Sequence, residues 1–327
     1  MLGRRGFVAG VAAALGVAVA ACRADPHSPA GVLRFANRPF FIDGDTLPAF
    51  ERATGIAVEY HEDQLDDAVF EAALREVGGA DLGRDLVVVN DQTAARLAAD
   101  SLLEALPRDT DIATMRTALE RGGPRRQVPW AVGVTGLAFV RGRVPGDVRS
   151  ARDLLAPDLA GQVAFVRDPM ESIGMVLLAM GVELERVTPA ALAAAADRVA
   201  GAREAGAVVV DTVFDADLGT ADGPWVAVGN AGDVAQLQAE GVDVAFVVPE
   251  EGGVLWSDDL VIPRGARNAA AAAQFVEFVY RPDVSRRLFA ALRFTSPVEG
   301  VGSLPPRLHR LRDLTAEETA IVTDALA

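Results

Sequence analysis

Short apolar runs alternate with segments of helical periodicity along most of the chain, and this alternation limits the folds it can adopt. Val32–Ala36 is the first apolar run, and Asp85–Asn90 is of the kind buried on both faces of a parallel sheet. Helical spacing marks Thr46–Thr54 and Ala94–Leu103. Strands that alternate with helices predict an α/β fold, and 327 residues suggest about two domains.

The charged residues exclude several functions. All 31 positively charged side chains are arginine, because the sequence contains no lysine. A Schiff-base lysine and a phosphate-loop lysine are therefore excluded. The net charge of −15 argues against a nucleic-acid partner, which requires a basic surface. It suits a cationic ligand, although an acidic surface also serves solubility.

The N-terminus has the pattern of an export signal. Arg4-Arg5-x-Phe7 looks like a twin-arginine motif, and the apolar run Phe7–Ala21 is too short to span a bilayer. Val19-Ala20-Ala21-Cys22 resembles a lipoprotein box and contains the only cysteine of the chain. We therefore predict a signal peptide at 1–22. The alternative is a plain secretory signal with an incidental cysteine.

We expect the protein to be exported, to the outer face of the cytoplasmic membrane or to the periplasmic space, and to be anchored by a lipid on Cys22. Residues 23–31 lack periodicity and are predicted to form a linker between this anchor and the first domain. A single thiol also excludes an internal disulfide.

The stretch from Val242 to Pro263 combines features that suit an organic ammonium. The run Val242–Val248 is interpreted as a buried strand, and Gly252-Gly253 as a tight turn. Trp256 follows, with Asp258 and Asp259 close behind. An aromatic face attracts a cation, and carboxylates accept its N–H bonds. The alternative is a turn capped by acids beside a half-buried tryptophan.

The sequence lacks the usual signatures of catalysis. It has no nucleophile motif, no dinucleotide-binding glycine pattern and no Cys-x-x-Cys. His27, His61 and His309 are far apart, and none forms a metal-binding pair. We therefore expect no enzyme, no cofactor and no metal.

Six ordered blocks resemble the spermidine/putrescine-binding family of bacterial ABC-importer solute-binding lipoproteins. The block with Glu251-Gly-Gly-x-x-Trp256-x-Asp258 is the most specific of them. The resemblance runs in order over about residues 32–300. The blocks are Phe50–Val58, Asp85–Val89, Val128–Gly136, Ser150–Val163, Pro249–Asp258 and Phe278–Val284.

This resemblance implies a periplasmic-binding-protein type II fold, in which two α/β lobes are joined by a hinge with two chain crossings. Residues 32–134 and 256–300 would form lobe one. Residues 135–255 would form lobe two, with the tail 301–327 packed against it.

The resemblance also implies which residues bind the ligand. Trp256 would be one wall of an aromatic box, and Asp258 an acid at the cleft. Asp168 and Glu171 match an acidic pair in lobe two, and Asn90 a polar residue after a strand.

The segment after the first strand departs from the family pattern. Asn37, Phe40 and Phe41 are expected near the ligand, with Phe41 in place of a tyrosine. Arg38 stands where a box tryptophan is expected, and Gly229 where a second one often lies. An arginine in the pocket would repel a diamine or neutralise one of its acids.

The resemblance predicts a monomeric binding protein that captures spermidine or putrescine and delivers it to the permease of an ABC transporter. One alternative is the same fold with an anionic or zwitterionic solute. Another is a polyamine-sensing lipoprotein without an importer.

Overall fold

A computed structural model describes residues 31–120, 124–144, 146 and 148–327. The predicted signal peptide, the lipoprotein box with Cys22 and all but the last residue of the predicted linker lie outside these residues.

The described residues form one ten-stranded mixed sheet covered by helices, with the main strand order β2-β1-β3-β9-β4-β7-β5-β6. The strands are β1 (Val32–Ala36), β2 (Ala57–His61), β3 (Leu86–Asn90), β4 (Gln127–Val140), β5 (Val163–Val166), β6 (Val208–Val210), β7 (Val226–Asn230), β8 (Val244–Val247), β9 (Gly253–Val261) and β10 (Leu308–His309). The α-helices are α1 (Thr46–Thr54), α2 (Asp67–Val77), α3 (Asp91–Ala99), α4 (Pro169–Ala179), α5 (Pro189–Glu204), α6 (Ala231–Ala239), α7 (Ala269–Val279), α8 (Pro282–Leu292) and α9 (Ala316–Asp324).

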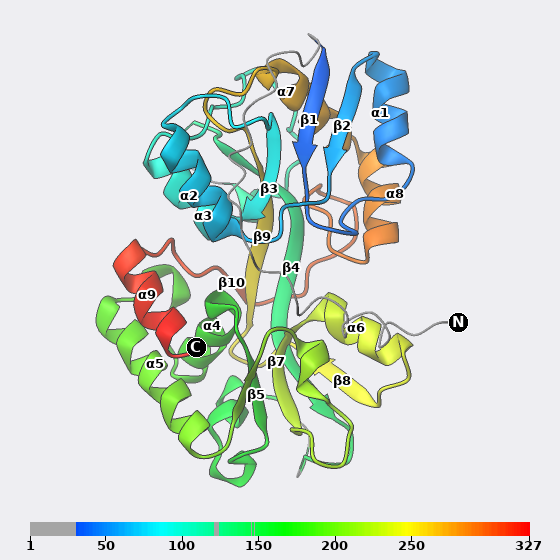
Figure 1. Ribbon diagram of the computed structural model, residues 1–327. Coiled ribbons are helices and arrows are strands. Elements are labelled where there is room, and N and C mark those ends of the chain that lie inside the picture. The colour runs from blue at the N-terminus through cyan, green and yellow to red at the C-terminus, as the bar shows by residue number, and fades with distance from the viewer. Residues whose placement is uncertain (1–30, 121–123, 145, 147) are drawn as a thin grey trace, which may run out of the picture.

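Lobe one is built around the parallel strands β2, β1 and β3 (Figure 1). Alternate residues of a strand point to opposite faces of the sheet. Leu86 and Val88 therefore belong to a core shared with α1, α7 and α8, while Val87 and Val89 pack against α2 and α3. Both faces are covered, which explains why β3 is a continuous apolar run.

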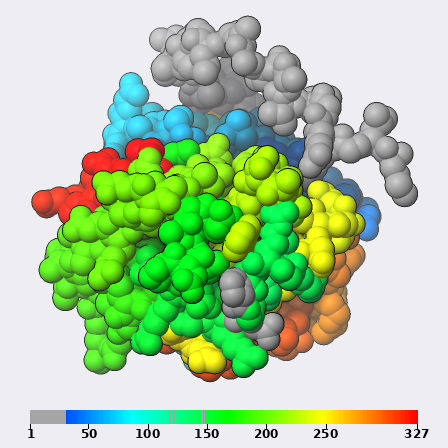
Figure 2. Space-filling model, turned by 90° about the horizontal axis from the view of Figure 1, so that it is seen from below, coloured from blue at the N-terminus to red at the C-terminus, as the bar shows by residue number. Residues whose placement is uncertain are grey.

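Lobe two is built in the same way around β7, β5 and β6. Helices α4, α5 and α9 share one core, and α6 packs on the opposite face. The C-terminal tail belongs to this lobe because Leu311, Leu314 and Val322 are buried in the same core as α4 and α5. Seen from below, segments coloured green to yellow form most of the surface, and the red C-terminal segment lies at one edge (Figure 2).

Strands β4 and β9 run antiparallel to each other and pass through both lobes (Figure 1). In lobe one, Val128 of β4 pairs with Leu260 of β9, next to β3. In lobe two, Thr135 of β4 pairs with Val254 of β9 and with Asn230 of β7. Two of the connections between the lobes, β4 and β9, are therefore strands that are hydrogen-bonded to each other. The tail makes a third connection, because it leads from α8 in lobe one to the core of lobe two.

The region around β9 decides one open alternative and corrects one prediction. Trp256, Asp258 and Asp259 lie within β9 rather than in a turn capped by the acids, because the turn ends at Gly252, whose φ is +114°. The run Val242–Val248 forms only the short, half-buried strand β8, which pairs with β4.

Within the described ranges, no helix is both long enough and apolar enough to cross a membrane.

Candidate functional site

Three strand ends bring helix N-termini to the region between the lobes. Each of β3, β5 and β7 leads directly into a helix, and the residues that cap these helices are Asn90, Asp168 and Asn230. Each cap side chain accepts a hydrogen bond from the first turn of its helix, as short polar side chains do at this position. Carboxyl ends of parallel strands are the usual position for ligands in α/β folds.

The strand register places the predicted residues of lobe one on one face of the sheet. Asn90 at the end of β3 lies directly across from Asp258 of β9. Trp256 is two residues before Asp258 and therefore points to the same face, where it lies across from Gly133 of β4.

Trp256 is held in place from two sides. Gly133 has no side chain, and a Cβ atom there would lie 2.0 Å from the indole, so the ring lies flat against β4. The indole N–H donates to Thr135 Oγ1 at 2.9 Å. The Thr135 hydroxyl in turn donates a short hydrogen bond to Glu171 of lobe two. Trp256 thus connects the aromatic part of the cleft to its acids.

Glu171 lies among other carboxylates. Loss of hydration, followed by the charge of Asp168, is the main cause that raises the pKa of Glu171 to about 8. The hydrogen bond from Thr135 opposes this shift, while Asp233 and Asp258 add smaller repulsions. These interactions bring acids from both lobes into one region.

Asp168 is exposed to solvent, although nearby protein atoms displace part of the water around its carboxylate. Loss of hydration raises the pKa of Asp168, and the backbone N–H groups of Glu171 and Met170 oppose that shift. Two charges of lobe one also act on the pKa of Asp168: Asp91 raises it and Arg38 lowers it. An accessible carboxylate in this position can accept N–H bonds from a ligand.

A small pocket of about 40 Å³ opens beside these acids in lobe two. Its lining includes Glu171, Gly229, Asn230 and Asp233. A cavity needs only about 10–15 Å³ to hold a water molecule, so this pocket fits an ammonium head rather than a whole ligand. Gly229, which lies where a tryptophan was expected from the resemblance, is also part of this lining.

Arg38 reaches into the lobe-one half of the cleft. Its Nε and Nη2 donate to Asp258 Oδ1 at 3.2 and 2.9 Å, and Nη2 also donates to Asp67 Oδ2 at 3.1 Å. Desolvation raises the pKa of Asp258, and the charge of Arg38 opposes this shift. The carboxylate predicted to bind a ligand ammonium is therefore already bound to an internal cation.

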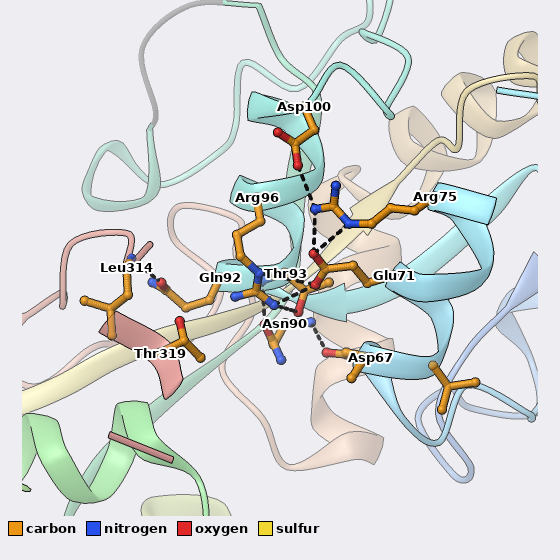
Figure 3. Close-up of polar contacts among 12 residues, drawn as sticks. Asp67, Glu71, Arg75, Asn90, Gln92, Thr93, Arg96, Asp100, Leu314 and Thr319 are labelled. Carbon is orange, nitrogen blue, oxygen red and sulfur yellow. Dashed lines mark hydrogen bonds and ion pairs between the residues drawn. The ribbon is translucent and has the colours of Figure 1, made fainter. Parts of the chain in front are cut away.

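Asp67 is fixed by the polar network shown in Figure 3. It accepts the backbone N–H of Asn90 at 2.8 Å, and the Asn90 side chain accepts from Thr93. Arg96 bonds both Thr93 and Glu71, which links α3 to α2. The position of the Arg38 partner thus depends on contacts between two helices.

A second arginine neutralises another lobe-one acid. Arg310, in the tail after β10, forms an ion pair with Asp91 at 2.7 Å. Four residues later the backbone N–H of Leu314 donates to Gln92 at 2.9 Å, as Figure 3 shows. The tail therefore contacts the N-terminal turn of α3 before it packs onto lobe two.

A family model for bacterial extracellular solute-binding proteins matches residues 46–309, most of the chain. The chain belongs to this family. Among curated relatives of this solute-binding protein, the spermidine/putrescine-binding periplasmic protein of Escherichia coli is 22% identical over 88% of the chain and 82% of the relative. The putrescine-binding periplasmic protein SpuD of Pseudomonas aeruginosa is 26% identical over 80% of the chain and 77% of the relative.

Solved structures show the same fold. The TpPotD lipoprotein of Treponema pallidum superposes with a TM-score of 0.76 at 22% identity, over 90% of this chain and 98% of that one. The predicted type II fold with two α/β lobes is therefore confirmed.

The other predicted residues of lobe one surround the site rather than lining it. Asn37 is fully buried, and its side chain bonds Phe41 O and the Arg38 N–H, which fixes the loop. Phe41 is buried against Phe294, which also meets the edge of Trp256. Phe40 is 79% exposed in this state.

Sequence reasoning missed several residues of the cleft. Asp233 could have been found, because Asn230-x-x-Asp233 follows an apolar strand just as Asn90-x-x-Thr93 does. Asp67, Asp91 and Arg310 gave no such local signal, because their contacts join distant parts of the chain. Among the residues that the structure describes, no group of three or more His, Cys, Asp or Glu could hold a metal ion.

Proposed function

We propose that this solute-binding protein captures an aliphatic amine of the polyamine type between its lobes and delivers it to the permease of an ABC importer. The main support for this proposal is a group of three lobe-two acids, Asp168, Glu171 and Asp233. None of these three forms an ion pair with the described part of the chain, and all lie near Trp256 through the contacts of Glu171.

Electrostatics supports a cationic ligand. The six carboxylates described above and their two arginine partners leave four negative charges when all are ionised. Asp211, which also lines the lobe-two pocket, is paired with Arg167 and leaves this balance unchanged. A charge-assisted hydrogen bond contributes about 1.5–3 kcal/mol, and a cation–π contact with Trp256 about 0.5–2 kcal/mol. A few such contacts are enough for micromolar affinity.

The names of the relatives support the same ligand class, since those described above are called spermidine/putrescine- or putrescine-binding proteins. We further propose that the protein is exported, anchored by a lipid on Cys22 and active as a monomer. Its role would be binding rather than catalysis.

Titration calorimetry with putrescine and spermidine tests the ligand class. We expect heat of binding with a dissociation constant in roughly the micromolar range. Absence of heat with both, together with an unchanged melting temperature at millimolar amine, would refute a polyamine as the ligand. Anchoring is tested separately by Cys22→Ser, which should release the protein from membranes.

A further inference from the structure

The lobe-one end of the cleft already contains a positive charge. The guanidinium of Arg38 is only partly exposed and bonds to Asp258 and Asp67, whose side chains are nearly buried. It reaches this place because the loop after β1 is fixed by Asn37, which accepts the Arg38 backbone N–H at 2.8 Å. Arg38 therefore belongs to the wall of the cleft and is not a mobile surface side chain.

Few acceptor sites remain near Arg38. Asp67 accepts N–H groups from Gln64, Asn90 and Arg38, and both of its oxygens are used. Asp258 uses one oxygen for two bonds from Arg38. An ammonium arriving at this end would meet a neighbouring positive charge and only one carboxylate oxygen without a bond to the described chain.

The lobe-two end has the opposite character. Glu171 and Asp233 line the ammonium-sized pocket, and Asp168 lies beside Glu171. No arginine of the described chain pairs with any of them. The lobe-two end of the cleft can therefore bind a ligand cation, while the lobe-one end already contains the guanidinium of Arg38.

We propose that Arg38 takes the place of one ligand ammonium, so that the cleft selects aliphatic amines with a single ammonium, bound in lobe two, and an uncharged or negative group facing Arg38. This inference rests on the proposed function, because it assumes that an amine binds between the lobes. It makes Arg38 a specificity-determining residue. The Nη1 group of Arg38 has no partner among the described residues and is available to such a group.

Four amines of matched chain length test this selectivity: putrescine, N-acetylputrescine, butylamine and γ-aminobutyrate. Calorimetry on the unmodified protein should show the three ligands with one ammonium binding about tenfold or more tightly than putrescine. A preference for γ-aminobutyrate would indicate that Arg38 binds a carboxylate. A preference for N-acetylputrescine or butylamine would indicate a neutral end.

The variant Arg38→Gln removes the internal cation and frees Asp258. It should shift the preference toward putrescine by about tenfold to a hundredfold. Arg38→Lys keeps the charge and should keep the original preference. Arg84→Gln removes the same charge from an ion pair of lobe one with Asp63, outside the contacts of the cleft, and should leave the preference unchanged.

The possible outcomes separate the two proposals. If none of the four amines nor spermidine binds, the proposed function fails. If putrescine binds the unmodified protein more tightly than the single-ammonium ligands, the function stands and the role of Arg38 is refuted. Because this comparison uses the unmodified protein, it holds even if Arg38→Gln does not fold.

Discussion

The acids named in the two halves of the cleft differ in whether an arginine is bound to them. In lobe one, Asp67 and Asp258 share Arg38, and Asp91 pairs with Arg310. In lobe two, Asp168, Glu171 and Asp233 have no arginine partner in the described chain. A count of acids alone would suggest two equivalent cation sites. The ion pairs show that only the lobe-two half keeps its acids available to a ligand.

The largest expected effect compares one acid from each half. Asp233→Asn should weaken amine binding by about tenfold to a hundredfold, because it removes an unpaired charge from the ammonium pocket. Asp258→Asn should weaken it only by about twofold to fivefold, because that carboxylate already serves Arg38. Calorimetry with the same amine measures both. Equal losses would contradict the asymmetry.

A second test measures amine affinity as a function of pH, because we expect the acids of lobe two to make that affinity depend strongly on pH. Between about 4.5 and about 8, the raised pKa of Glu171 keeps a proton on the folded, empty protein that the unfolded chain has lost. The stability of the empty protein therefore falls as pH rises through this window. An ammonium favours the ionised form, so binding releases the proton. Affinity should increase by up to about tenfold per pH unit and level off above about pH 8.

Calorimetry in buffers of different ionisation enthalpy measures this proton release. Glu171→Gln cannot ionise, so its affinity should be lower and nearly independent of pH over the same range. A wild-type affinity that does not change with pH would show that Glu171 stays ionised in the empty cleft, or does not contact the amine.

A smaller effect than the loss of Asp233 is expected at the aromatic wall between the halves. Gly133→Ala places a methyl group where the indole of Trp256 lies, so the ring must move away from Thr135. Binding should weaken by about threefold to tenfold. Gly201→Ala in α5 faces open space and is the matched control. Calorimetry and tryptophan fluorescence follow both variants. A changed emission with unchanged binding for Gly133→Ala would exclude Trp256 as a ligand contact.

Local patterns were sufficient for most elements of the fold. The helix predicted at Thr46–Thr54 is present with the same bounds, and Gly55 ends it in the left-handed conformation expected of a C-terminal glycine. The sequence also predicted an α/β alternation and singled out Trp256 with Asp258 and Asp259 as residues suited to an organic ammonium. The resemblance to a known family added the two lobes.

Long-range pairing explains what the sequence did not predict. Local patterns do not show that Gln127–Val140 is one strand, β4, because its continuity depends on pairing with the distant strand β9. The direction of Arg38 also could not be predicted, because its partners Asp67 and Asp258 lie 29 and 220 residues away. Ion pairs of this kind depend on the packing of whole lobes.

The position of β9 between β3 and β4 has a consequence for how the chain acquires its structure. During synthesis, β3 and β4 emerge well before their shared neighbour, so the first lobe stays incomplete until the segment after Pro249 is available. The inserted lobe has most of its strands and helices in one continuous stretch and can assemble earlier. Any premature stop before Gly253 would leave β3 and β4 without their central partner, an arrangement prone to aggregation.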